Sequence, residues 1–166
     1  YSFNDNMVVE YVGTSTAEII PSPPMDKKKV EDEIRKTIEK EKIDNTSVSS
    51  DESGVTITME DINFRPESDV LLPKEQEKLA KIAAILKKHP QRDILIAGHT
   101  ALAGTEEGRQ RLSEGRAKAV GEYLSLMGVT NNMVFKGYGA RLPLADNETE
   151  EGMKKNRRVE IRILEN

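Results

Sequence analysis

One arginine in this chain stands among apolar residues at a helical spacing. Leu112, Arg116, Val120 and Leu124 recur every four residues, after a loop at 98–104. The spacing puts the Arg116 guanidinium on the apolar face of a predicted helix, where an unpaired charge is costly. Two interpretations stay open. One is a structural salt bridge or a side chain that reaches back to the surface. The other is a guanidinium held beside the loop to bind an anion, preferably a carboxylate.

A strand, a loop and a helix must position this arginine. The apolar run at 94–97 predicts a buried strand directly before the loop. Thr105 is a suitable N-cap for the helix, and Glu106 and Glu107 follow it in the first turn, where the helix dipole favours acids. Gly128 is a suitable cap at the other end. The sequence therefore predicts that the loop and Arg116 face a common space.

The rest of the chain adds helices and strands to this unit. Apolar stripes predict helices at 26–42 and 72–88, and alternation predicts strands at 46–49, 55–59, 133–139 and 157–163, with an irregular loop at 142–152. This order indicates an α+β or α/β mixture, with one sheet and helices packed on one side. We interpret residues 1–24 as the end of an upstream region or a linker arm. This segment contains a possible strand at 7–12 and a proline-rich stretch at 21–24. We assign 25–53 to a helix and a short strand that lead into the domain, and 54–166 to the domain itself.

Composition excludes several classes of function. The chain has 166 residues and a net charge of −4, which argues against a general nucleic-acid binder. No apolar run approaches the roughly 18 residues of a transmembrane helix, and no secretion signal is visible. The absence of cysteine excludes disulfides and thiol chemistry. Because the chain opens on tyrosine, we expect it to be a trimmed piece of a longer protein.

Other candidate sites are weaker. His89 and His99 do not have a metal-ligand spacing, so structural roles are favoured and no metal or cofactor is expected. We expect the His99 ring nitrogens to shape the loop. Ser113 and Thr100 have no triad motif nearby, and the acids are scattered over helix surfaces, so we expect no catalysis.

The motifs along the chain resemble a known family. From about residue 54 to residue 164, the chain resembles the OmpA-like C-terminal domain, the peptidoglycan-associating module of bacterial envelope proteins. The matching residues, in the family's order, are Gly98-His99-Thr100, Gly104, Leu112-Ser113, Arg116-Ala117, Val120, Tyr123-Leu124, Gly128-Val129, Gly137-Tyr138-Gly139, Asn147, Thr149 and Asn156-Arg157-Arg158-Val159-Glu160.

This resemblance implies an α+β fold, a mixed β-sheet with helices packed on one face, and a domain that is not an enzyme. It also implies a ligand, the diaminopimelate side chain of the peptidoglycan stem peptide. In the family an Asp directly after the loop Thr takes the ligand's ammonium, and the helix Arg, here Arg116, takes a carboxylate. Arg157 and Arg158 fall on opposite faces of the last strand, and we expect Arg157 to reach the pocket and Arg158 to be solvated. The site residues predicted in this way are Thr100, Ala101, Gly104, Arg109, Arg116 and Arg157.

The chain departs from the family at two of these positions. Ala101 stands where the family has its Asp, and Gly108-Arg109 replaces a Tyr-Asn pair. The carboxylate half of the site is therefore present, whereas the ammonium half is absent and Arg109 opposes it. Loss of one charge-assisted contact, worth about 1.5–3 kcal/mol, weakens binding roughly ten- to a hundredfold.

Two hypotheses follow from this departure. Either the domain still associates with the wall but holds a different or modified peptide, or it has become a scaffold that contacts other envelope proteins. Both imply a periplasmic or cell-envelope location, with anchoring to the outer membrane through upstream sequence.

Overall fold

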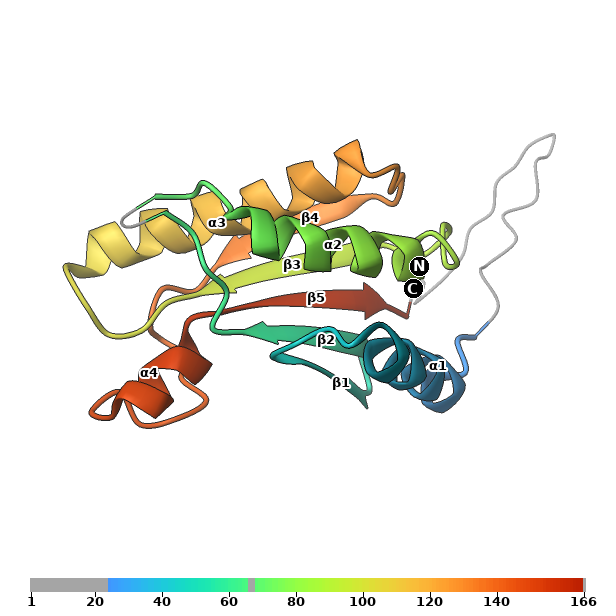
Figure 1. The fold of residues 1–166 in the computed structure, drawn as a ribbon, viewed down its shortest axis with the longest axis horizontal. Helices are drawn as coiled ribbons and strands as arrows, with labels where there is room; N and C mark the ends of the chain where they lie inside the picture. The colour runs from blue at the N-terminus through green and yellow to red at the C-terminus, as the bar shows by residue number, and fades with distance from the viewer. Residues whose placement is uncertain (1–23, 66–67, 166) are drawn as a thin grey trace, which may run out of the picture.

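The structure, a computed structural model, describes residues 24–65 and 68–165 (Figure 1). Within these ranges the chain forms one five-stranded sheet and four helices. The sheet has the order β1-β2-β5-β3-β4, and all neighbours are antiparallel except the parallel pair β3 and β4. The strands are β1 (Thr46–Asp51), β2 (Gly54–Glu60), β3 (Ile94–His99), β4 (Met133–Gly137) and β5 (Arg158–Leu164). The helices are α1 (Lys27–Glu41), α2 (Pro73–Leu86), α3 (Glu106–Leu126) and α4 (Glu150–Asn156).

One face of the sheet is apolar because the central strands alternate in register. Ile57, Ile161 and Ile96 lie opposite one another on β2, β5 and β3, and none is exposed to solvent. The residues between them point to the other face, which carries Thr58, Glu160 and charged neighbours. The sheet therefore presents one side to a hydrophobic core and the other side to polar surroundings.

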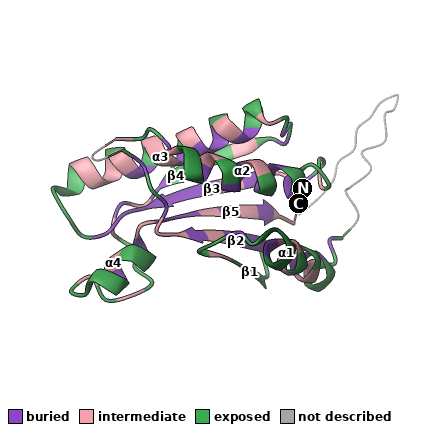
Figure 2. Ribbon diagram, viewed as in Figure 1, coloured by how far each residue is buried: buried purple, intermediate pink, exposed green. Residues whose placement is uncertain are grey.

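The three longer helices supply the rest of the core. α1 packs on β1 and β2, α3 packs on β3 and β4, and α2 contacts both helices. Figure 2 shows strands that are mostly buried beneath helices whose outer surfaces are exposed. This arrangement confirms the expected α+β fold with helices packed on one face of a mixed sheet.

The structure describes only part of the N-terminal segments that were assigned from the sequence. The predicted strand at 7–12 and most of the proline-rich stretch lie outside the described residues. α1 buries Val30, Ile34 and Ile38 in the common core, and β1 pairs with β2 along its length. The division of the chain at residue 54 falls between these two paired strands and stays a prediction.

The segment predicted as an irregular loop, 142–152, runs into the first turn of α4, so the prediction was wrong for residues 150–152. Thr149 caps this helix by accepting a hydrogen bond from the Gly152 amide at 2.9 Å. Acids at 150 and 151 and lysines at 154 and 155 suit the two ends of the helix dipole. A helix of seven residues with an internal glycine has too few turns for its periodicity to be recognised.

The stripe of α3 also differs from the predicted one. Val120 and Leu124 are fully buried, but Leu112 is only half-buried and Arg116 lies at the border of the buried face. Residues four apart drift by about 40° per step around a helix, so a row at this spacing leaves the core over three turns. The buried line instead runs back through Ala117 to Ser113.

Candidate functional site

The loop before α3 is placed by a close approach of backbone to backbone at the end of β3. A Cβ on Gly98 would lie 2.2 Å from the Ser113 carbonyl oxygen, so only glycine lets α3 lie this close to the strand. The Ser113 hydroxyl is buried, donates to the Gln110 carbonyl at 2.9 Å and accepts from the Gly139 amide at 3.0 Å. These contacts hold the first turns of α3 above the ends of two parallel strands.

Hydrogen bonds fix the loop itself at both ends. The Thr100 amide donates to the Gly139 carbonyl at 2.8 Å. Gly104 has φ +74°, a backbone conformation that suits glycine, and its carbonyl accepts from Arg109 Nη1 at 2.6 Å. Between them, the Leu102 amide donates to Asn147 Oδ1 at 3.2 Å. The loop is therefore held in one conformation by α3 and by the segment before α4.

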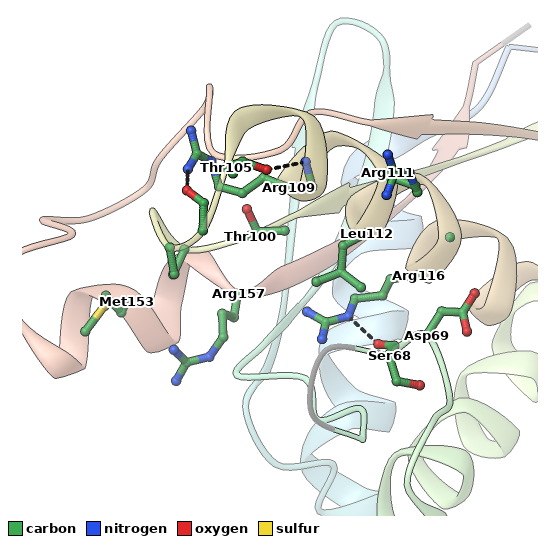
Figure 3. Close-up of a pocket in the computed structure, with 15 residues that line it drawn as sticks. Ser68, Asp69, Thr100, Thr105, Arg109, Arg111, Leu112, Arg116, Met153 and Arg157 are labelled. Carbon is green, nitrogen blue, oxygen red and sulfur yellow. Dashed lines mark hydrogen bonds between the residues drawn. The ribbon is translucent and has the colours of Figure 1, made fainter.

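A cavity of about 840 Å³ opens between this loop, α3, the segment at 68–69 and α4 (Figure 3). All six predicted site residues lie in its wall: Thr100, Ala101, Gly104, Arg109, Arg116 and Arg157. Their role in binding stays a prediction, but the fold does bring them together.

Arg116 is held in this cavity by neutral groups. Its Nε donates to the Ser68 carbonyl at 3.0 Å, and its Cζ lies 4.6 Å from the centroid of the Phe64 ring. Its two terminal nitrogens have no hydrogen-bond partner among the described residues. Burial, and then the like charge of Arg157, lower the pKa of Arg116 below its usual value, and Asp69 offsets part of this. A guanidinium in this state gains from an added anion, as the second interpretation of the sequence required.

Arg157 lies across the cavity from Arg116, and it already has anionic neighbours. Its Nη2 is 3.6 Å from Asp61 Oδ1 and 3.8 Å from Glu150 Oε1. Neither acid belongs to the cavity wall. Of the two guanidinium groups, Arg116 is therefore the one with the greater need for an anionic ligand.

The position expected to hold an ammonium has no charge. Ala101 is 6% exposed and contributes a methyl group to the wall. Asp69 is the one acid among the described wall residues, and Figure 3 shows it on the far side of Arg116 from Thr100 and Arg157. The hydroxyl of Thr100 is buried and has no hydrogen-bond partner among the described residues. The described wall therefore offers guanidinium groups, without an acid at the loop.

Several wall residues were not predicted from the sequence. Ser68 fixes Arg116 from 48 residues away, and it was not connected with the pocket from the sequence. Met153 enters the wall from α4, which was not predicted at all. A signal for this helix was present in Thr149 followed by two acids, an N-cap pattern.

The polar face of the sheet contains a second buried cluster behind the loop. His99 lies opposite Arg158, and its ring stacks on Tyr138 at a centroid distance of 5.2 Å. Neither ring nitrogen has a hydrogen-bond partner within 24–65 and 68–165, so the expectation that they shape the loop was wrong. Burial, then the charge of Arg158, lower the pKa of His99 to about 4, whereas Glu160 acts in the opposite direction.

Arg158 was expected to be solvated, and that prediction was also wrong. It is 3% exposed, with Nε donating to Glu160 Oε2 at 2.8 Å and Nη2 donating to the Leu142 carbonyl at 3.0 Å. Alternation along a strand assigns a residue to a face, but it does not reveal that a loop covers that face. Arg157, by contrast, lines the pocket.

Neither a metal site nor a membrane span was found in the part of the chain that the structure describes. No three or more metal-ligating side chains gather within residues 24–65 and 68–165. None of the described helices is long and apolar enough to cross a bilayer.

Comparison with known proteins gives a consistent result. Residues 63–157 match the model of the OmpA family. The probable lipoprotein YiaD of Escherichia coli is 33% identical over 128 residues, which cover 75% of this chain and 58% of that protein. The peptidoglycan-binding protein ArfA of Mycobacterium tuberculosis is 40% identical over 101 residues, which cover 60% of this chain and 31% of ArfA. The chain therefore spans from about a third to three fifths of these relatives.

A solved structure shares the fold as well. An outer membrane protein from Borrelia burgdorferi superposes with a TM-score of 0.60 at 39% sequence identity. The match covers 72% of this chain and 96% of that structure.

Proposed function

The chain belongs to the OmpA family, and from this membership we propose that it binds the stem peptide of peptidoglycan through a carboxylate held by Arg116. The family consists of structural peptidoglycan-binding and anchoring domains rather than enzymes, so the chain is not an enzyme. Its relative ArfA is named as a peptidoglycan-binding protein. We expect the domain to work in the periplasm, and attachment to the outer membrane is a further expectation.

The observation that carries this proposal is the state of Arg116. Its guanidinium is fixed by Ser68 and Phe64, faces a cavity of about 840 Å³, and has two terminal nitrogens without a partner in the described residues. A planar pair of N–H donors matches the two oxygens of a carboxylate. We propose that recognition of diaminopimelate is weakened, because Ala101 cannot pair with its ammonium.

A second candidate follows from the same alanine. If the missing acid has abolished wall binding, the domain is an OmpA-like scaffold for contacts with other envelope proteins. The two candidates differ in whether the purified chain associates with peptidoglycan at all.

Co-sedimentation with purified sacculi tests the proposal. The chain should sediment with the sacculi, and Arg116→Gln should reduce the bound fraction at least about tenfold, since one charge-assisted contact is lost. Lys118→Gln, which removes a charge from an exposed position on the same helix, should bind as the wild type does. If the wild type stays in the supernatant, the scaffold is favoured. If Arg116→Gln sediments fully, Arg116 is not the contact.

A further inference from the structure

We propose that the pocket binds the C-terminal residue of a wall peptide. This residue has a free main-chain carboxylate, a small side chain and an uncharged amide nitrogen that joins it to the residue before. The alternative ligand is the zwitterionic side-chain end of diaminopimelate. This inference rests on the proposed function and specifies which end of the peptide Arg116 binds.

The charges in the cavity wall favour a ligand that is anionic without being zwitterionic. Among the described residues, the wall contains four arginines, Arg109, Arg111, Arg116 and Arg157, against a single acid. Arg157 is accompanied by two acids outside the wall, whereas the one hydrogen bond of Arg116 to a described residue goes to a neutral carbonyl. A carboxylate beside Arg116 therefore relieves a local excess of positive charge, whereas an ammonium added with it restores that excess.

The described residues provide no counter-charge at the loop, where an ammonium would lie. Diaminopimelate bears its side-chain ammonium and carboxylate on the same carbon, so both groups would lie within a few ångströms of Arg116. At the loop they would meet the buried methyl of Ala101. Asp69 cannot replace the missing acid, because it lies beyond Arg116 from the loop, beside Gly115 (Figure 3). A charged nitrogen taken from water to this position would remain unpaired.

A neutral amide fits the same position. The last residue of a peptide also carries a nitrogen next to its terminal carboxylate, but as an N–H donor without charge. Thr100 is 6% exposed, lines the cavity and has a hydroxyl oxygen with no hydrogen-bond partner among the residues that the structure describes. The oxygen itself is buried in this structure, and a rotation of the Thr100 side chain that turns it toward the cavity lets it accept the amide N–H while the carboxylate lies against Arg116. Binding would thereby give partners to the Thr100 hydroxyl and to the terminal nitrogens of Arg116, which have none among the described residues.

The apolar part of the wall favours a small final side chain. The methyl group of Ala101 and the half-buried side chain of Leu112 both border the cavity. A methyl group, as in the D-alanine that ends a wall peptide, can be buried there without exposing a polar atom to apolar surroundings. Ala101, which cannot pair with an ammonium, thus contributes to the apolar surface that would contact this methyl group.

A pair of peptides that differ only at the terminus tests this inference. The first peptide, diacetyl-Lys-D-Ala-D-Ala, has a free carboxylate and no free amine. The second is the same peptide with its C-terminus converted to an amide, which carries no charge. In calorimetric titrations the acid should bind about ten- to a hundredfold more tightly than the amide, which cannot make the charge-assisted contact with Arg116. Equal affinity for the two peptides would overturn the inference.

Variants at Thr100 provide the second readout. Thr100→Val keeps the shape but removes the acceptor, and it should weaken binding of the acid peptide about three- to tenfold. Thr100→Ser keeps the hydroxyl and should bind nearly as the wild type does, with circular dichroism confirming that both variants are folded. Unchanged affinity in Thr100→Val contradicts the role given to the hydroxyl.

Sacculus binding separates this inference from the proposed function. If the chain sediments with sacculi but binds neither peptide, wall association stands and the peptide terminus is the wrong ligand. If it fails to sediment and also binds neither peptide, the proposed function fails as well.

Discussion

At the scale of single residues, Arg116 and Ala101 define the character of the pocket. Arg116 is oriented from one side by a carbonyl and from below by an aromatic ring. Its position is therefore set before a ligand arrives, which lowers the entropy lost on binding. Ala101 is equally well placed but brings only a methyl group. In the proposed function, Arg116 supplies one half of a zwitterion-binding pair, and the position of the other half is neutral.

We predict that Arg116→Lys does not preserve ligand binding. Lysine keeps the charge but has neither the planar fork that pairs with a carboxylate nor a guanidinium face to stack on Phe64. Affinity for the carboxylate peptide should fall about tenfold or more, while thermal stability stays near that of the wild type, because Arg116 lies at the border of the core. Calorimetry and thermal melting measure the two effects. A lysine variant that binds at full affinity would show that charge alone is recognised.

At the scale of elements, glycines set how closely α3 approaches the sheet. Gly98 and Gly115 both lie near the pocket, but their surroundings differ. A Cβ on Gly98 would meet backbone at 2.2 Å, whereas a Cβ on Gly115 would meet the end of the exposed Asp69 side chain at 3.0 Å. Backbone in a packed element cannot move aside as a surface carboxylate can.

This contrast yields a matched pair of alanine variants. Gly98→Ala should destabilise the fold by about 1–3 kcal/mol or more, because α3 must shift away from β3. Gly115→Ala should be neutral or stabilise by up to about 1 kcal/mol, because alanine is the better helix former. Urea unfolding of both variants measures the difference. Equal stabilities would contradict the close packing described for the end of β3.

The elements also differ in whether the sequence alone predicted them. The alternation of Val159, Ile161 and Ile163 predicted β5, and the Thr105 cap predicted the start of α3, because both signals are local. The stripe through Arg116 was predicted too deep in the core, since a spacing of four drifts around the helix. The contact between Ser68 and Arg116 joins residues 48 apart, and no local pattern encodes it. The pocket residues on the loop were therefore predicted, but the side chains that orient them were not.

At the scale of the whole molecule, the sheet separates two polar sites. The pocket lies beside α3, at the end of β3 and the start of β5, and the buried His99 and Arg158 lie on the opposite face of the sheet at the same place. The two sites are neighbours in sequence, since Thr100 follows His99 and Arg157 precedes Arg158. Any condition that disturbs the buried cluster therefore acts on the strand ends that support the pocket.

Acid should be such a condition. The pKa of His99 is lowered to about 4 in the folded protein, below an unperturbed value of about 6.5, so the unfolded chain binds more protons between these two values. Stability should therefore fall as the pH drops from about 6.5 to about 4, by up to about 3 kcal/mol, and this contribution should level off below pH 4.

Urea unfolding across this pH range checks the prediction. His99→Phe keeps a ring to stack on Tyr138 but cannot titrate, and it should flatten most of the slope. His89→Gln should retain most of the slope of stability against pH, because the His89 side chain is less buried than that of His99. An unchanged slope in His99→Phe would assign the acid sensitivity to other groups.

The central claim is that the pocket holds a carboxylate but has lost its partner for an ammonium. It is tested most directly by titrating the wild type and Ala101→Asp with free diaminopimelate in a calorimeter. We predict that the wild type binds weakly or not at all, and that Ala101→Asp binds at least about tenfold more tightly, since it regains one charge-assisted contact. Wild-type binding as tight as that of Ala101→Asp would contradict the claim, because another group would then hold the ammonium.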